Sequence, residues 1–292
     1  MKLSDLLNRH AEKGDQERAG KEQACDTAPS FEPGPVASSA SHRAPAEPRL
    51  SDAPVAQGGS GGVADIVFLL DVTGSMQPCI DALKNNIAAF LGTLSERDGP
   101  APVRDWRARV VGYRDYNYDD APPLEVFPFV RSTSLLQKQL AALEARGGGD
   151  EEESLLDALY KVASCAASRS GEEDAQLWRS RADAVRIVVV FTDAPYRQVM
   201  SLPEARGGTV QDVANLLMSE RIVLSVFAPD MPCYDMLAQT DKSEYHPVPY
   251  DLGDDYGPQK ALALFTSRPE AFRQTLMQLA RSISKSAETP VL

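Results

Sequence analysis

The 292-residue sequence has few of the side chains that most often bind transition metals or perform acid–base catalysis. It contains three histidines and four cysteines, and no two cysteines form a CxxC pair. We expect neither a disulfide framework, which is typical of short secreted chains, nor a structural zinc site, which needs closely spaced ligands. Cys79, Cys165 and Cys233 are predicted to be small buried apolar side chains.

Basic residues and long apolar runs are also scarce. Lys and Arg number 30 against 42 Asp and Glu, which gives a formal net charge of −12. Nucleic-acid binding needs clustered basic side chains, so this charge argues against it. No run of about 18 apolar residues is present, and the charged N-terminus lacks the apolar core of a signal peptide. The sequence therefore predicts a cytoplasmic protein that binds neither nucleic acid nor membrane.

The first 62 residues differ in composition from the rest. Residues 27–62 are rich in Ala, Pro, Ser and Gly, with almost no large apolar side chain. Such a stretch cannot bury enough surface to offset the entropy lost on ordering. We predict a disordered tail and linker over 1–62, one folded domain over 63–285 and a C-terminal tail over 286–292. A short helix is expected after Ser4 within the first tail.

From Val63 onward, short apolar runs alternate with segments of helical periodicity. Strands are predicted over residues 63–70, 107–112, 186–191 and 222–227, with an edge strand over 124–130 and an irregular strand over 245–250. Helices are predicted over about 78–94, 135–145 and 154–166, and after Thr209 and Ser267. This order predicts an α/β fold: a doubly wound, mostly parallel, Rossmann-like sheet with helices on both faces. Such sheets bind ligands at the carboxyl ends of the strands, where the strand order reverses.

Polar residues follow the first predicted strand in the segment FLLDVTGSM, residues 68–76. Asp71, Thr73 and Ser75 alternate on the turn before the next helix, so their oxygens can point to a common centre. One carboxylate and two hydroxyls form a hard, oxygen-only set that suits Mg²⁺ or Mn²⁺ rather than zinc. The alternative is a helix cap, since Ser, Thr and Asp are common at helix starts.

Two further aspartates are expected at the same edge of the sheet. Asp150 follows three glycines and precedes a predicted helix, and Asp193 follows a buried strand just before Pro195. With these loops added, a metal site is favoured over a cap. The predicted ligands are Asp71, Thr73, Ser75, Asp150 and Asp193.

Other acidic residues near these loops are expected to have structural roles. Glu151, Glu152 and Glu153 are predicted to form a solvated first helical turn that complements the helix dipole. Asp115, in the segment GYRDY, is expected to pair with Arg114 or another surface group.

With these predicted ligands in this order along an α/β pattern, the sequence resembles the von Willebrand factor type A (vWA) domain with its metal-ion-dependent adhesion site (MIDAS), over about residues 63–285. The family pattern is Asp-x-Ser-x-Ser after the first strand, a Thr in a second loop and an Asp after a later strand. Asp71, Thr73 and Ser75 match the first element, Asp193 matches the last, and Asp150 stands in place of the second-loop Thr. The resemblance implies that the hydroxyls bind the metal directly, that the acids often bind it through water, and that a partner carboxylate fills an open position.

We therefore expect a metal-dependent binding module for a protein partner rather than an enzyme. An extra carboxylate at Asp150 would weaken the pull of the cation on an acidic partner. One alternative is an adaptor subunit of a larger ATPase or of a kinase- or phosphatase-linked complex. Another is a Mg²⁺-dependent phosphatase-like hydrolase, because a strand that ends in Asp is similar to the start of haloacid-dehalogenase-like phosphatases. Thr73, however, stands where that group has its second Asp.

Overall fold

The computed structural model describes residues 62–95, 103–116, 124–148, 151–205, 207–241, 243–250, 253 and 257–288. The chain divides into two units, Met1–Ala56 and Gln57–Leu292, and all described residues belong to the second. The predicted N-terminal tail with its short helix, and the predicted ligand Asp150, lie outside the described residues.

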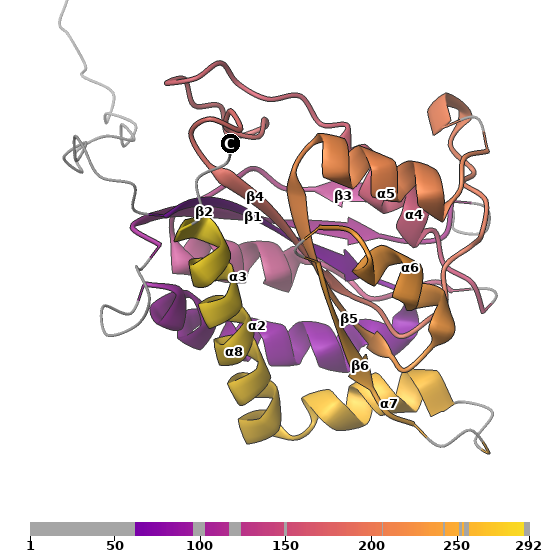
Figure 1. The fold of residues 1–292 in the computed structure, drawn as a ribbon. Coiled ribbons are helices and arrows are strands. Elements are labelled where there is room, and N and C mark those ends of the chain that lie inside the picture. The colour runs from indigo at the N-terminus through magenta and orange to yellow at the C-terminus, as the bar shows by residue number, and fades with distance from the viewer. Residues whose placement is uncertain are drawn as a thin grey trace, which may run out of the picture. The chain divides into compact units, whose positions relative to one another are not determined.

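A six-stranded sheet with the order β3-β2-β1-β4-β5-β6 forms the centre of this unit (Figure 1). Five strands are parallel, and the edge strand β3 (Leu124–Val126) is antiparallel to its neighbour. The parallel strands are β1 (Val63–Asp71), β2 (Asp105–Tyr113), β4 (Val185–Phe191), β5 (Ile222–Pro229) and β6 (Glu244–Val248). Strand order reverses between β1 and β4, which confirms the predicted doubly wound, mostly parallel sheet. The predicted strand over 124–130 is shorter than expected: beyond Val126, one backbone hydrogen bond from Phe127 to Val110 and an isolated bridge between Ala108 and Val130 continue the contact with β2.

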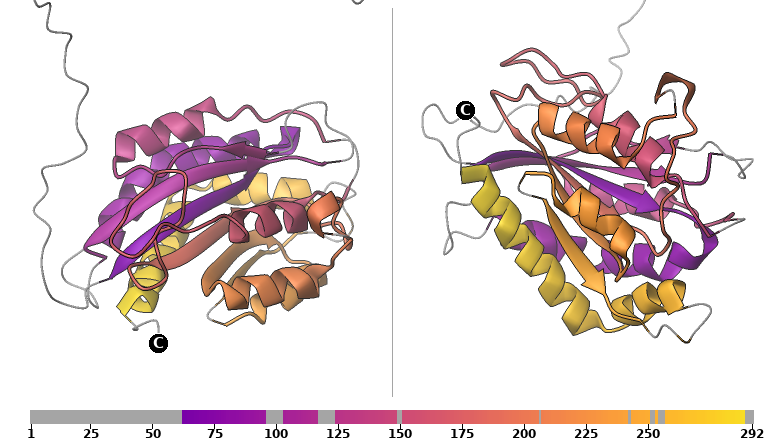
Figure 2. Two further views of the ribbon diagram at one scale, coloured as in Figure 1. Left: turned by 90° about the horizontal axis from the view of Figure 1, so that it is seen from above. Right: turned by 45° about the vertical axis from the view of Figure 1, so that its right-hand side comes forward.

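Helices cover both faces of the sheet (Figures 1 and 2). One face carries α2 (Gln77–Leu94), α3 (Thr133–Ala142), α7 (Gly257–Thr266) and α8 (Pro269–Glu288). The other carries α4 (Leu155–Ala163), α5 (Val210–Ser219) and α6 (Asp235–Ala238). Short 3-10 helices follow three loops: η1 (Gly74–Met76), η2 (Pro203–Ala205) and η3 (Pro232–Tyr234). The sequence patterns predicted neither α6 nor α7, and α8 continues past the predicted domain end at residue 285.

Strand β1 explains why the sequence shows unbroken apolar runs. Phe68 and Leu70 pack in the hydrophobic core on the α2 side, whereas Val67 and Leu69 pack in the core on the α4 side. A strand buried on both faces needs apolar side chains at every position, so its pattern does not alternate.

The amino-terminal half of the sheet is fixed by a buried carboxylate, Asp65 on β1. It accepts hydrogen bonds from Nε and Nη2 of Arg107 at 2.8 and 2.7 Å. The backbone N–H and Nε of Arg179 donate to it as well, both at 2.7 Å. Arg179 also pairs with Asp105 at the start of β2. This ion cluster joins β1, β2 and the segment before β4 through one fully buried acid.

We predict that Asp65→Asn lowers the free energy of unfolding by about 3–5 kcal/mol, because it leaves two buried guanidinium groups without their shared charge. The matched control is Asp105→Asn, whose side chain is 40% exposed and pairs with the same Arg179. Its loss should be about 1 kcal/mol or less. Urea unfolding of both variants measures the difference, and equal losses would contradict the central role of Asp65.

Candidate metal centre

The candidate site lies where β1 and β4 end side by side. Asp71 is the last residue of β1, and Asp193 follows the end of β4 at Phe191. These two strands pair in parallel at the point where strand order reverses. The structure therefore brings the two predicted aspartates to the same edge of the sheet.

Asp71 is fully buried and holds two threonines. Its Oδ1 accepts hydrogen bonds from the backbone N–H of Thr73 at 2.9 Å and from the Thr73 hydroxyl at 2.7 Å. Its Oδ2 accepts one from the hydroxyl of Thr192 at 2.9 Å. Because the Thr73 hydroxyl gives its hydrogen to Asp71, its lone pairs are left for another partner. Thr192, which sequence reasoning missed, ties the end of β4 to Asp71.

Asp193 has the most unusual environment at this edge. The residue is 1% exposed, and neither of its carboxylate oxygens has a hydrogen-bond partner among the described residues. Burial raises the pKa of Asp193, and the nearby Ser75 side chain opposes this shift. Ser75 itself is exposed, so the site opens toward solvent on that side.

The two aspartates also act on each other. Burial and the charge of Asp193 together raise the pKa of Asp71. Within the described part of the chain, neither carboxylate forms an ion pair with Lys, Arg or His. Two buried carboxylates with raised pKa values, one of them raised further by the charge of the other, create the electrostatic condition that a bound cation relieves. The donor set therefore fits a hard divalent cation.

The predicted second loop packs against the first. The Arg146 N–H donates to the Val72 carbonyl at 2.9 Å, and the Gly74 N–H donates to the Gly147 carbonyl at 3.3 Å. Gly148 has a φ of +91°, and a Cβ there would lie 3.4 Å from the Thr73 Cβ. The glycine run thus allows a left-handed turn in close contact with residues 71–75.

Asp115 is placed differently from its prediction. It is fully buried rather than on the surface, and it pairs with Arg197 at 2.6 Å instead of Arg114. The Ser154 hydroxyl also donates to it at 3.3 Å. Arg114 pairs with Glu125 instead. Asp115 and Arg197 are 82 positions apart in the sequence, so no local pattern could indicate the pair.

The glutamate run also departs from its prediction. Glu151 and Glu152 are exposed, but Glu153 is only 3% exposed. Helix α4 begins at Leu155, so the glutamates precede the first turn instead of forming it. Sequence reasoning missed Glu153 because three consecutive glutamates are typical of a solvated surface.

The prediction for the cysteines is only partly confirmed, since Cys79 is buried whereas Cys165 and Cys233 are partly exposed.

Within the described ranges, no group of three or more His, Cys, Asp or Glu side chains is arranged to hold a metal ion. A cation at the β1–β4 edge would therefore need hydroxyl ligands as well as carboxylates.

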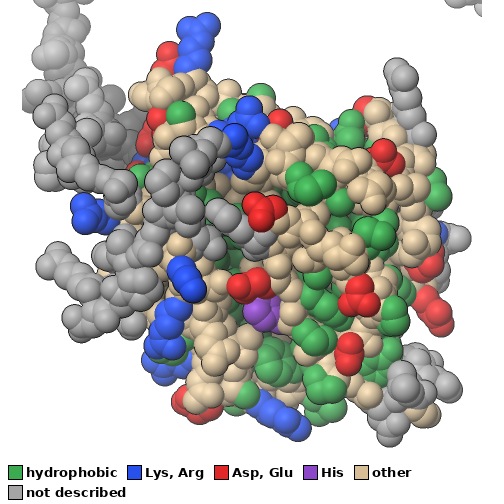
Figure 3. Space-filling view, in the orientation of Figure 1, with side chains coloured by type: hydrophobic (Ala, Val, Ile, Leu, Met, Phe, Trp, Pro, Cys, Tyr) green, Lys and Arg blue, Asp and Glu red, His purple; other side chains and the backbone are tan. Residues whose placement is uncertain are grey.

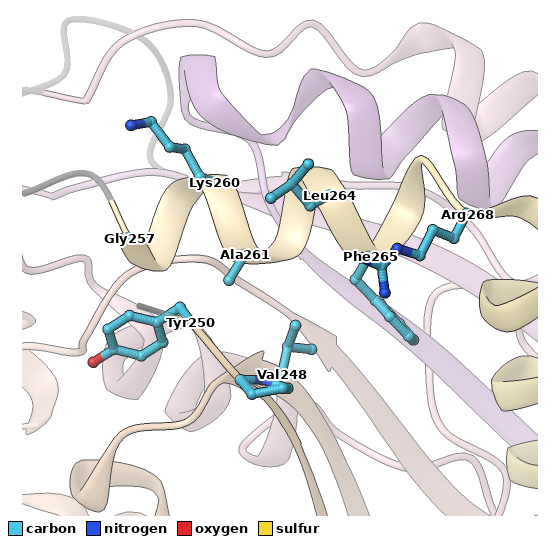
Figure 4. Close-up of a pocket in the computed structure, with 9 residues that line it drawn as sticks. Val248, Tyr250, Gly257, Lys260, Ala261, Leu264, Phe265 and Arg268 are labelled. Carbon is cyan, nitrogen blue, oxygen red and sulfur yellow. The ribbon is translucent and has the colours of Figure 1, made fainter. Parts of the chain in front are cut away.

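A hollow of about 370 Å³ lies between the end of β6 and α7 (Figure 4). Lys260 and Arg268 stand at the two ends of α7, and the lining between them is mostly apolar. Two cationic side chains make this hollow unsuited to a metal ion. Leu264 of α7 is 59% exposed, and Figure 3 shows apolar patches with scattered acidic side chains on part of this face. Helix α7 packs against η1, the turn that follows Thr73.

The chain belongs to the von Willebrand factor type A domain family, whose sequence pattern matches residues 65–246. Domains of this family commonly mediate protein–protein interactions. Among the described residues, no helix has the length and apolar character needed to cross a membrane.

Two solved structures of proximal thread matrix protein 1 from the mussel byssus are similar to this chain, with 14% and 13% sequence identity and TM-scores of 0.45. The matches cover 71% and 74% of this chain but only 47% of each of those chains. Identities this low say nothing about function. No curated protein matches the sequence.

We predict that Asp193→Asn stabilises the metal-free protein at pH 7.5 by about 1–2 kcal/mol, because it removes the charge repulsion between two buried carboxylates. The raised pKa values mean that the wild type loses stability as pH rises from about 4 toward neutral, where the folded pair must ionise. The variant should lose less over this range. Urea unfolding in EDTA at several pH values tests this, and a less stable variant at pH 7.5 would contradict it.

Proposed function

We propose that this protein is a metal-dependent protein-interaction module. In this proposal, Mg²⁺ or Mn²⁺ is held by Asp71, Thr73, Ser75, Asp193 and, from the second loop, Asp150. The observation that carries the proposal is the buried Asp193 carboxylate, which has no hydrogen-bond partner among the described residues and lies beside Asp71 and Ser75. Membership in the vWA family supports a protein as the partner.

The hydrogen bonds suggest how the ligands divide their roles. Asp71 already accepts three hydrogen bonds, so it is suited to orient Thr73 and to reach the ion through water. Thr73 and Ser75 would supply hydroxyl oxygens directly, and Asp193 would supply charge. When bound, the ion would offer a position for an oxygen of the partner, and exposed Ser75 marks the side from which the partner can approach.

We propose binding rather than catalysis for this site. A phosphatase of the haloacid-dehalogenase type would use Asp71 as its nucleophile, but this carboxylate is fully buried and accepts hydrogen bonds on both oxygens. Thr73, in the position of the acid–base aspartate, donates its own hydrogen to Asp71. Neither residue is arranged for attack on a phosphate.

Thermal unfolding in EDTA and then in Mg²⁺, Mn²⁺ or Ca²⁺ tests this proposal, because a metal that binds only the folded state raises its stability by mass action. Metal at 100 times its Kd adds about 2.7 kcal/mol, which corresponds to roughly 5–10 °C for a domain of this size. We expect this rise in the wild type and its loss in Asp71→Ala.

The matched control is Asp230→Ala, which removes an exposed aspartate just after the end of β5. Its response to metal should equal that of the wild type. A wild type that does not respond to millimolar metal would overturn the metal-dependent function. Equal responses of Asp71→Ala and the wild type would overturn the ligand assignment alone.

A further inference from the structure

We infer that Glu153 is a further carboxylate of this metal centre, positioned to act on the bound cation through water. The inference rests on the proposed metal-dependent function. It assigns a role to a residue whose sequence context predicts a solvated surface.

The buried position of the Glu153 side chain supports this inference. Glu153 is 3% exposed, although both preceding glutamates are exposed. A Cβ added to Gly148 would lie 3.8 Å from Glu153 Oε1 and 3.4 Å from the Thr73 Cβ. The glutamate oxygen and the Thr73 side chain therefore flank the same point, in the gap that Gly148 leaves open.

Tyr113, at the end of β2, lies within reach of the charges of both acids. Burial raises the pKa of Tyr113, and the charges of both Asp71 and Glu153 contribute to this rise. The glutamate therefore shares a buried neighbourhood with the aspartate at the centre of the site. Asp71 ends β1 and Glu153 precedes α4, so the charges of two separate segments of the chain act on the same buried phenol.

Backbone hydrogen bonds fix the position of Glu153. The Glu153 N–H donates to the Pro195 carbonyl at 2.8 Å, and the Glu153 carbonyl accepts from the Arg197 N–H at 3.0 Å. This short parallel bridge ties Glu153 to the loop that carries Asp193. The glutamate, Thr73 and Asp193 thus belong to three loops that are hydrogen-bonded to one another or to Asp71.

The arrangement of the acidic side chains favours a place for Glu153 outside the direct ligands of the ion, with a water molecule between them. The described carboxylates do not converge as three direct ligands of one ion. Glu153 can instead accept a hydrogen bond from a metal-bound water, a role in which a carboxylate orients the water and adds negative charge. Removal of such an outer carboxylate typically weakens metal affinity by about 10–100-fold.

The test compares Glu153→Gln with Glu152→Gln, its exposed neighbour, in the full-length chain. Mn²⁺ binding is measured by the loss of the free-ion signal in electron paramagnetic resonance, and stability in EDTA is measured by thermal unfolding. We expect the Kd for Mn²⁺ to rise by about 10–100-fold in Glu153→Gln and to stay unchanged in Glu152→Gln. Glu153→Asp, which keeps the charge, should recover part of the affinity.

Each outcome decides the inference. If the wild type binds Mn²⁺ and Glu153→Gln binds it equally well, Glu153 has no role at the metal, while the proposed function stands. If the wild type does not bind Mn²⁺, the proposed metal-dependent function and the role of Glu153 are both wrong. If Glu153→Gln fails to fold in EDTA while Glu152→Gln folds, the carboxylate serves the fold, and the inference is overturned.

Discussion

The burial of Asp71 and Asp193 at one point of the sheet is the constraint around which this edge of the protein is organised. Two carboxylates lose their hydration there, which raises the pKa of both, and the charge of Asp193 raises the pKa of Asp71 further. Three hydrogen bonds to Asp71 offset part of this penalty, but the oxygens of Asp193 receive none from the described residues. A fold that keeps such an arrangement gives up stability unless a cation completes it.

The opposite half of β1 shows what a purely structural buried acid looks like. Asp65 is as deeply buried as Asp71, but two arginines satisfy its charge and both of its oxygens within the fold. The same strand thus carries one acid with internal cations and one without. Because Asp65 and Asp71 are equally buried, burial alone does not explain the difference between them. The internal arginines fit a structural role for Asp65, and their absence at Asp71 fits the proposed ligand-binding role.

The sequence predicted the features that depend on local pattern. Continuous apolar runs located β1, β2, β4 and β5, and an aspartate after a buried strand located Asp71 and Asp193. Sequence patterns did not predict features that depend on distant partners. The Asp115–Arg197 pair, for example, joins loops that only the folded sheet brings together. The burial of Glu153 was missed for a different reason, because three consecutive glutamates are typical of a solvated surface. Helix α7 follows an irregular edge strand and carries exposed Leu264, so its apolar spacing was a weak signal.

The charge around the proposed ion bears on what a partner can offer. Asp71 and Asp193 alone balance a divalent cation, and a second-loop acid, Asp150 or Glu153, would make the centre net negative. Such a centre attracts a partner carboxylate less strongly than the family resemblance implies, whereas a carbonyl, amide or hydroxyl oxygen can coordinate a hard cation without added charge. In this proposal, a neutral oxygen of the partner is therefore a better match for the ion than a carboxylate.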